Sequence, residues 1–343
     1  MKNNLKITNL SHKYKNGKSI KNLNLEIRSN EVVCILGPSG SGKTTLLRLI
    51  AGFEDPNDGE ITVGKTIVFG SKYVPTEKRA IGMLFQDIAL FPHLSVKDNI
   101  GFSLAKNNKY MPTIKKLLKK IGLEGYEDRF SSSISGGEQQ RIALARALAN
   151  NPDVMLLDEP FGSLDSSSKY DIAVDIIKVL KKSKTPTIMV SHDAQEAMRL
   201  ADRIIVMYDG GIIDEGIPKD LYSSPKHPFS AKLIGPTSSY IFKSKNGILH
   251  TPFGNIDVKT SKNVEFELII RPEAFTYSKN SKKSFSINIV KYRYLGLLTE
   301  INISVGKGNQ SIKFFIFSNI LDKVLLNKKI LFNKEWAFVF PIK

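Results

Sequence analysis

The sequence predicts an α/β protein in which a mostly parallel sheet, covered by helices on both faces, is followed by a smaller β-rich domain. Over residues 1 to about 235, short apolar runs rich in Val and Ile alternate with helical patterns, and this alternation is typical of βαβ units. Beyond residue 235 the chain consists of short alternating segments separated by Gly, Asn and Lys, which is typical of a small all-β domain. A chain of 343 residues is long enough for both domains.

The strands of the first domain are predicted at apolar runs that are too short for helices. These runs cover residues 31–36, 154–158, 187–191 and 203–208. Between Phe91 and Asn150 the strand pattern disappears, and apolar residues recur with helical spacing, as at Ile114, Leu117, Leu118 and Ile121. A mainly helical insertion is therefore predicted at about residues 88–150.

The domain boundary is predicted at the stretch Gly235–Ser239, whose Gly, Pro, Thr and Ser residues are typical of a linker. The two domains then span residues 1–235 and 236–343. In the second domain, strands are predicted at residues 264–271, 284–292, 299–305, 311–317 and 336–341. A barrel of the oligonucleotide-binding type is one arrangement that fits this pattern.

The composition narrows the class of protein. The formal net charge is +17, and from Thr237 onward 17 Lys plus Arg stand against 7 Asp plus Glu, so that +10 of the +17 lies in the last third. Because these lysines are scattered and form no dense basic run, a solvated surface is favoured over a nucleic-acid site. No apolar run approaches the roughly 18 to 20 residues of a membrane-spanning helix. The polar amino terminus also lacks a secretory signal, so a cytoplasmic location is expected.

The only cysteine, Cys34, lies inside the predicted strand at 31–36. We predict that it is a small buried hydrophobe and not a nucleophile or metal ligand.

A glycine-rich segment connects this strand to a predicted helix at 45–51, and it has the pattern G-x-x-x-x-G-K-[ST], written out as Gly37-Pro38-Ser39-Gly40-Ser41-Gly42-Lys43-Thr44. Glycines let the backbone wrap phosphates closely, and the N–H groups at the start of the helix point at negative charge. We predict that Lys43 reaches the β- and γ-phosphates and that the Thr44 hydroxyl coordinates Mg²⁺. A glycine turn that only caps a helix is the alternative.

The predicted strand at 154–158 ends in two adjacent carboxylates, Asp158 and Glu159. Open α/β folds bind ligands at the carboxyl end of the sheet, which predicts that Asp158 holds the Mg²⁺ hydration shell. Glu159 is predicted to face the γ-phosphate as general base for the attacking water. Acidic residues at a strand end are by themselves typical of a solvated turn. Because this pair occurs in a chain that also has a phosphate loop, a functional role is favoured.

A second glycine pair follows at Ser135-Gly136-Gly137-Glu138, where a predicted helix begins that runs to Ala149. Ser135 and Glu138 form a capping-box pattern, which accounts for the serine and the glutamate. It does not account for two consecutive glycines, because they cost backbone entropy. The pair predicts that another group approaches the backbone closely.

These segments together resemble the ABC ATPase family, whose signature sequence has the form Leu-Ser-Gly-Gly-Gln. Here Ile134 replaces the leucine, which conserves volume, and Glu138 replaces the glutamine. Tyr14 resembles the family's aromatic residue that stacks on adenine, and His192 resembles its switch histidine. Gln86 resembles the glutamine between the two lobes, and Asp165 belongs to the segment that follows the acid pair.

The resemblance implies a P-loop NTPase with a RecA-like sheet core and a helical insertion, followed by a small OB-like (TOBE-type) domain. It implies ATP and Mg²⁺ as cofactors, with catalytic roles for Glu159, His192 and Gln86 and metal ligation by Thr44, Gln86 and Asp158. The implied nucleotide-binding residues are Tyr14, Gly37, Pro38, Ser39, Gly40, Ser41, Gly42, Lys43, Thr44, Thr45, Ser135, Gly136, Gly137 and Asp165. It also implies a head-to-tail homodimer, in which the signature segment of one copy covers the nucleotide of the other.

Several further stretches resemble the importer branch of this family, among them residues 85–96, 191–197, 270–273 and 294–296. The resemblance implies an ATP-driven importer subunit at the cytoplasmic face of the plasma membrane, with separate permease subunits and, indirectly, a periplasmic or lipid-anchored solute-binding protein. The segment Phe91-Pro92-His93 favours ferric iron, while polyamine, thiamine, sulfate and sugar stay open. The alternatives from other classes are an exporter motor and a soluble ABC ATPase acting on ribosomes or DNA, although no nucleic-acid partner is expected.

Overall fold

The computed structural model describes residues 5–14, 17, 19–104, 110–162, 169–260, 263–277, 284–304 and 311–342. Contacts between residues divide the chain into two units, Met1–Pro218 and Lys219–Lys343. The boundary predicted from the sequence lies later, at residue 235. In the structure, helix α8 (Pro228–Ile234), which precedes that predicted boundary, belongs to the second unit.

The first unit is built on a six-stranded sheet that is parallel except for its edge strand β10. In spatial order its strands are β10 (Gly211–Gly216), β9 (Arg203–Tyr208), β3 (Val32–Leu36), β8 (Thr187–Val190), β7 (Val154–Asp158) and β6 (Ile81–Leu84). The four strands predicted from apolar runs are confirmed to within a residue at each end. Because β3, β8 and β7 are parallel neighbours, their carboxyl ends meet at one edge of the sheet.

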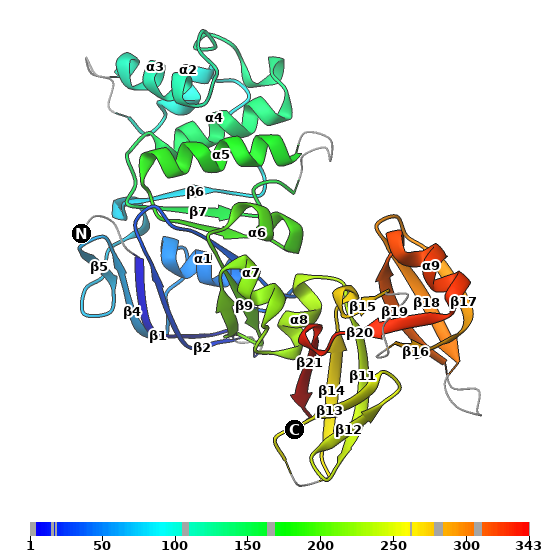
Figure 1. Ribbon diagram of the computed structural model, residues 1–343. Helices are drawn as coiled ribbons and strands as arrows, with labels where there is room; N and C mark the ends of the chain where they lie inside the picture. Colours follow the sequence, from blue (N-terminus) through cyan, green and yellow to red (C-terminus); the bar gives the residue numbers. More distant parts are fainter. Residues whose placement is uncertain are drawn as a thin grey trace. The chain divides into compact units, whose positions relative to one another are not determined.

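A second, antiparallel sheet has the order β2 (Ser19–Ile27), β1 (Leu5–Lys13), β4 (Asp58–Val63) and β5 (Thr66–Phe69). Helix α1 (Lys43–Ala51) shares one hydrophobic core with both sheets, to which its buried Leu46 and Ile50 contribute. Figure 1 shows this helix between the two sheets. The helix that begins at the phosphate loop is therefore clamped from two sides.

The helical insertion is confirmed, since the described residues between 91 and 150 contain helices and no strand. Its helices are α2 (Val96–Ile100), α3 (Tyr110–Lys120) and α4 (Gly136–Leu148). They gather at one end of the first unit, with α5 (Lys169–Ser183) next to α4 (Figure 1). The last helix of this unit is α6 (Ala194–Leu200), which contacts β3.

The second unit is β-rich, as predicted, and its strands surround one core that includes Phe253, Phe275 and Phe314. Its helices are α7 (Pro218–Ser223), which begins at the division, α8 and α9 (Leu321–Asn327). Its strands are β11 (Ser238–Lys245), β12 (Ile248–Thr251), β13 (Gly254–Asp257), β14 (Glu265–Ile270), β15 (Phe275–Thr276), β16 (Phe285–Ser286), β17 (Asn288–Tyr294), β18 (Leu298–Ser304), β19 (Ser311–Phe317), β20 (Lys329–Phe332) and β21 (Ala337–Pro341). They form one five-stranded and two three-stranded sheets.

Strands β11, β12, β13, β15 and β20 lie outside the segments predicted from the sequence, and two predicted segments differ from the structure. The strand predicted at 284–292 is interrupted at Ile287, which is buried and donates its N–H to the Lys328 carbonyl. The stretch predicted as a linker is packed: a Cβ on Gly235 would lie 2.9 Å from Arg271 Nη1, and the same nitrogen donates to the Pro236 carbonyl. The Tyr222 ring comes closer still, since its Cε2 would lie 2.7 Å from the same Cβ. The glycine at 235 is therefore explained by close approach of the Tyr222 ring and the buried Arg271.

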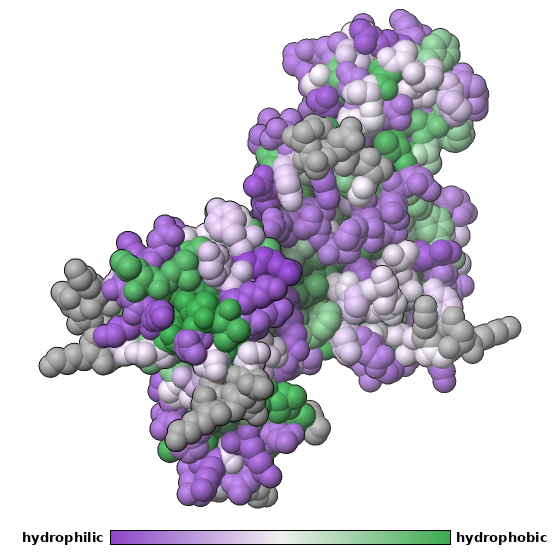
Figure 2. All heavy atoms as spheres, turned by 90° about the vertical axis from the view of Figure 1, so that its right-hand side faces the viewer, coloured by the Kyte–Doolittle hydropathy of each residue, from purple (hydrophilic) through white to green (hydrophobic). Residues whose placement is uncertain are grey.

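Figure 2 shows apolar side chains gathered on one face of the second unit. Exposed apolar residues of β17 and the turn after it are Val290, Tyr294, Leu295 and Leu297. Among the helices that the structure describes, none is long and apolar enough to cross a membrane. Cys34 is fully buried in β3, as predicted, and burial raises the pKa of its thiol well above the usual value.

Candidate active site

The glycine-rich segment forms the connection between β3 and α1, as its pattern predicts. Gly42, the N-cap of α1, has φ = 99°, a left-handed conformation that favours glycine. Gly37 has no space for a side chain, because a Cβ there would lie 2.3 Å from the Met207 carbonyl oxygen of β9. These two glycines let the chain turn tightly from the strand into the helix.

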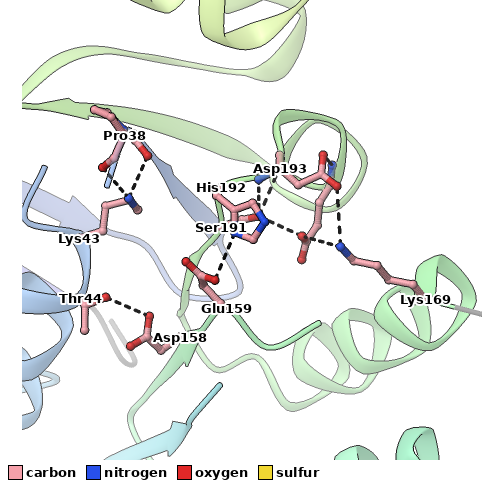
Figure 3. Close-up of polar contacts among 11 residues, drawn as sticks. Pro38, Lys43, Thr44, Asp158, Glu159, Lys169, Ser191, His192 and Asp193 are labelled. Atoms are coloured by element: carbon pink, nitrogen blue, oxygen red, sulfur yellow. Dashed lines mark hydrogen bonds and ion pairs between the residues drawn. The ribbon is translucent and has the colours of Figure 1, made fainter. Parts of the chain in front are cut away.

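Lys43 lies inside this turn and is held by it. Its ammonium donates to the carbonyl oxygens of Gly37 at 2.8 Å and Pro38 at 3.0 Å (Figure 3). Burial lowers the pKa of Lys43, while the nearby carboxylates of Glu159 and Asp158 act in the opposite direction. The ammonium is thus positioned beside the acid pair, with carbonyl partners that phosphate oxygens can replace.

A pocket of about 250 Å³ opens in front of the loop. Its lining includes most of the predicted nucleotide-binding residues of this part of the chain, namely Tyr14, Ser39, Gly40, Gly42, Lys43, Thr44 and Thr45, together with Glu159. The lining also includes Ser19 and Ile20 of β2, which the sequence analysis missed because an ordinary strand pattern gives no signal for them. Ser41 is buried instead.

The metal-binding prediction concerns Thr44, Asp158 and Gln86. Thr44 Oγ1 donates to Asp158 Oδ1 at 3.4 Å (Figure 3), and burial raises the pKa of Asp158 more than this hydrogen bond lowers it. Gln86 is exposed in the loop after β6, the strand that pairs with β7. In the described part of the chain no cluster of three or more His, Cys, Asp or Glu side chains could form a metal cage. A hydroxyl and a single carboxylate fit Mg²⁺, which is typically held by few protein oxygens together with phosphates and water.

Glu159 and His192 meet at the ends of β7 and β8. His192 Nδ1 lies 3.2 Å from Glu159 Oε2 (Figure 3). Glu159 has φ = 45°, a left-handed conformation that is uncommon for a non-glycine residue, and its N–H donates to the Val190 carbonyl of β8. The side chains of Glu159 and His192 are 26% and 67% exposed, and of these two residues Glu159 lines the pocket.

Tyr14 is anchored through its hydroxyl. This hydroxyl donates to the Glu54 carboxylate and lies 3.4 Å from Thr45 Oγ1, and Glu54 also accepts from Arg48 Nε at 2.7 Å. The Tyr14 and His12 rings meet in a T-shaped arrangement with their centroids 4.6 Å apart. Burial and Glu54 both raise the pKa of Tyr14. The sequence analysis found Tyr14 through a resemblance, but it had no signal for its partner Glu54.

The capping box predicted at Ser135 and Glu138 is confirmed. Ser135 Oγ accepts from the Glu138 N–H, and the Glu138 carboxylate accepts from the Ser135 N–H at 2.8 Å and from the Ser135 hydroxyl at 2.9 Å. The carboxylate also accepts from the Tyr126 hydroxyl at 2.8 Å. These donors, first of all the Ser135 N–H, hold the pKa of Glu138 below its usual value.

The two glycines after Ser135 differ from each other. A Cβ on Gly137 would lie 2.5 Å from Ile172 Cδ1 of α5, which accounts for this glycine within the chain. A Cβ on Gly136 would meet nothing within 4 Å among the described residues. None of Ser135, Gly136 and Gly137 is among the described residues that line the pocket. The expectation for Asp165 falls on residues 163–168, which lie outside the described part of the chain.

A phosphate loop after β3 of a parallel sheet, with an acid pair at the end of β7, two strands along the sheet, defines a P-loop nucleoside triphosphatase. A family model described as "ABC transporter" matches residues 20–162. The spermidine/putrescine import ATP-binding protein PotA of Clostridioides difficile (strain 630) is 37% identical over 89% of both chains. The chain therefore belongs to the ABC transporter ATP-binding family, and it is an ATPase that uses ATP with Mg²⁺.

Other relatives are similar over a comparable length. The Fe(3+) ions import ATP-binding protein FbpC of Haemophilus influenzae (strain 86-028NP) is 36% identical over 88% of this chain and 89% of the relative. The sulfate/thiosulfate import ATP-binding protein CysA of Mesostigma viride is 37% identical over 93% and 92%. The solutes in these names therefore differ at nearly equal identity.

Solved structures agree on the fold of the first unit. The cbiO1 protein of Clostridium perfringens, described as part of the ABC transporter complex cbiONQ, has a TM-score of 0.59 at 28% identity and covers 65% of this chain and 92% of its own. A dimeric structure of the ATP-binding cassette MJ0796 bound to ADP and Pi has a TM-score of 0.53 at 32% identity and covers 62% and 98%.

Proposed function

We propose that this chain is the ATP-hydrolysing subunit of a solute importer, and that it works as a head-to-tail dimer on separate permease subunits. One observation carries the dimer: Ser135 and Gly136 stand exposed at the start of α4, while the pocket gathers the residues of the phosphate loop and Glu159. A second copy can supply its signature segment to this pocket. The three relatives named above are all import ATP-binding proteins that match 88% or more of this chain, which supports the importer branch.

In the proposed site, the triphosphate follows the N–H groups of the loop into α1, whose amino terminus favours negative charge. Lys43 exchanges its carbonyl partners for phosphate oxygens, and Tyr14 provides a ring for the adenine. Thr44, Asp158 and Gln86 hold Mg²⁺, which when bound neutralises charge on the phosphates. A pocket of about 250 Å³ in one copy is at the lower end for a complete ligand site, which fits a site closed by a second copy.

Glu159 is the proposed general base. Its carboxylate accepts the proton of the attacking water, and its position is fixed by the backbone hydrogen bond to β8 and by the left-handed turn. His192, 3.2 Å away, orients this carboxylate and reaches toward the terminal phosphate. In the dimer, the N–H groups of Gly136 and Gly137 of the other copy then meet the same phosphate, so its cleavage loosens the dimer.

The remaining partners follow from this role. The dimer works on transmembrane permease subunits, which places the chain at the cytoplasmic face of the plasma membrane as a peripheral protein. A periplasmic or lipid-anchored solute-binding protein acts indirectly by delivering the solute to the permease. We expect no nucleic-acid partner, because the excess lysines of the last third are scattered.

The imported solute does not touch this subunit in the proposed assembly. Ferric iron is the solute favoured by the segment Phe91-Pro92-His93, and iron, polyamine and sulfate all occur in the names of the relatives. The solute therefore has to be found by experiment.

The test is the ATPase rate of the chain reconstituted with its permease and solute-binding protein in liposomes. Ferric iron, spermidine and sulfate are added one at a time, and we expect one of them to stimulate hydrolysis. If only spermidine or only sulfate stimulates hydrolysis, that compound is the imported solute and the assignment of ferric iron is wrong. The chain is also expected to sediment with membranes only when its permease is co-expressed. Salt-resistant binding to RNA or DNA, without any dependence on the permease, would contradict the importer role.

A further inference from the structure

A buried acid lies behind the active site and has no role in the mechanism above. Glu196 of α6 is 4% exposed. Its Oε2 accepts from the Ser191 hydroxyl at 2.9 Å, whereas its Oε1 has no hydrogen-bond partner among the described residues. Burial raises the pKa of Glu196. A carboxylate in such a place is costly unless a cation compensates it.

Lys169 provides this cation from a different helix. Its ammonium lies 3.6 Å from Glu196 Oε2 and 3.7 Å from Asp193 Oδ2, and its side chain is only 16% exposed. Figure 3 shows Lys169 extending from the start of α5 toward the loop that carries Asp193. Because the pair is largely shielded from water, removal of one partner leaves an uncompensated buried charge and costs more than at a surface ion pair.

This ion pair is connected to the residues on both sides of His192. The Ser191 hydroxyl, which donates to Glu196, accepts from the Asp193 N–H at 3.0 Å. Asp193, which faces Lys169, caps α6 by accepting from the N–H groups of Gln195 and Glu196. The His192 side chain is itself 67% exposed, so packing around its ring does not fix it. Its place opposite Glu159 depends on the backbone that Ser191 and Asp193 hold.

We propose that Lys169 and Glu196 are positioning residues whose buried ion pair fixes the loop Ser191–Asp193 and thereby holds the His192 imidazole against Glu159. The inference rests on the proposed role of His192 in hydrolysis. Lys169 opens the helix that follows residues 163–168, so the pair also ties α5 to the loop of the switch histidine.

The pair has a pH signature, which follows from the groups around Glu196. These are Lys169 from α5, Asp193 and Ser191 from the loop before α6, and the thiol of Cys34 from β3. Lys169 and Ser191 lower the pKa of Glu196, while burial and Asp193 raise it. Removal of the lysine charge must therefore raise this pKa further. In such a variant the loop is undisturbed at low pH, where the carboxyl is neutral, and disturbed at high pH, where an unpaired charge is buried.

The experiment compares the ATPase rate of the purified full chain and its variants between pH 6 and pH 9. For Lys169→Met we expect kcat to fall by at least about 10-fold at the high end, since small displacements of catalytic groups cost up to about 10²-fold. The loss should shrink as the pH is lowered, and KM for ATP should change little. The double variant Lys169→Met, Glu196→Gln buries no unpaired charge and keeps an acceptor for Ser191, so its kcat should return to within about 3-fold of the native value without the new pH dependence.

Lys178→Met is the matched control, because Lys178 lies on the same helix in an exposed ion pair with Asp175. It should behave as the native chain does. Native kcat at every pH in Lys169→Met would overturn the proposal, as would a loss that neither low pH nor Glu196→Gln reverses. If Lys169→Met does not fold, the double variant Lys169→Met, Glu196→Gln is the test. The proposal requires this double variant to fold and to hydrolyse ATP, and its failure to do so would overturn the proposal. A His192→Ala variant separates the two hypotheses: full turnover there would contradict the role of His192 itself.

Discussion

Glu159 is the residue on which the proposed chemistry depends most directly. In Glu159→Gln the side chain keeps its size and its contact with His192 but cannot accept a proton. We therefore expect ATP binding to persist and kcat to fall by about 10²-fold or more, the usual contribution of a general base. The measurement is single-turnover hydrolysis of radiolabelled ATP. Glu77→Gln, an exposed acid elsewhere in the first unit, serves as the control, and full turnover in Glu159→Gln would remove the residue from this role.

The sequence allowed prediction of residues whose chemistry needs fixed spacing along the chain. The loop from Gly37 to Thr44 and the adjacent pair Asp158 and Glu159 are local patterns, and each lies where a strand ends. Partners that come from distant segments could not be predicted in this way. Glu54 lies 40 residues from Tyr14, and Lys169 meets Glu196 only after α5 and α6 have packed together, so neither pair leaves a pattern in the sequence.

At the scale of the elements, the contribution of the capping box at the start of α4 to stability can be measured. In Ser135→Ala the Glu138 N–H and the Glu138 carboxylate both lose a partner, and we expect the free energy of unfolding to fall by about 1 kcal/mol. The folded-state pKa of Glu138 is lowered, so the stability that its carboxylate contributes is present above the unfolded-state pKa of about 4.5 and is lost as pH falls through the lower folded-state pKa.

Urea unfolding at neutral pH and below pH 4 measures this difference. Ser133→Ala is the matched control, because the exposed Ser133 hydroxyl, two residues earlier, donates to the Phe130 carbonyl and caps no helix. A deficit of the Ser135→Ala variant that stays constant or grows in acid would contradict a contribution of the hydrogen bond from the Ser135 hydroxyl to the Glu138 carboxylate.

At this same scale, the wholly buried strands of the parallel sheet were predictable, whereas the half-buried parallel strand β6 and the strands of the antiparallel sheet were not. The parallel strands β3, β7 and β8 are almost wholly buried, so each is a continuous apolar run. Strand β1 is buried on one face only, and bulges between Ile7 and Leu10 and between Leu10 and His12 shift its register against β2. Such shifts break the two-residue alternation that marks a half-buried strand.

For the whole molecule, the central question is whether two copies close on the nucleotide. The chain itself uses Gly137 to accommodate Ile172, but among its described residues it offers no contact that explains Gly136. A side chain at position 136 would meet no described residue of its own copy, but in the proposed dimer it would lie at the nucleotide of the other copy. A substitution there therefore tests dimerisation without disturbing the fold of the single copy. This property makes Gly136 a better probe than Gly137, where a side chain would also disturb α5.

We predict that Gly136→Ala folds with unchanged or slightly higher stability, by up to about 1 kcal/mol, because alanine restricts the unfolded chain and its Cβ meets nothing within 4 Å among the described residues. In the dimer the same methyl group would stand between the helix backbone and the phosphate of the other copy. In a Glu159→Gln background, ATP should therefore no longer produce a dimer in analytical ultracentrifugation, whereas Gly211→Ala, another glycine with room for a Cβ, should leave the dimer intact. A Gly136→Ala chain that dimerises with ATP as the parent does would mean that the signature segment does not cover a nucleotide, and the proposed assembly would have to be abandoned.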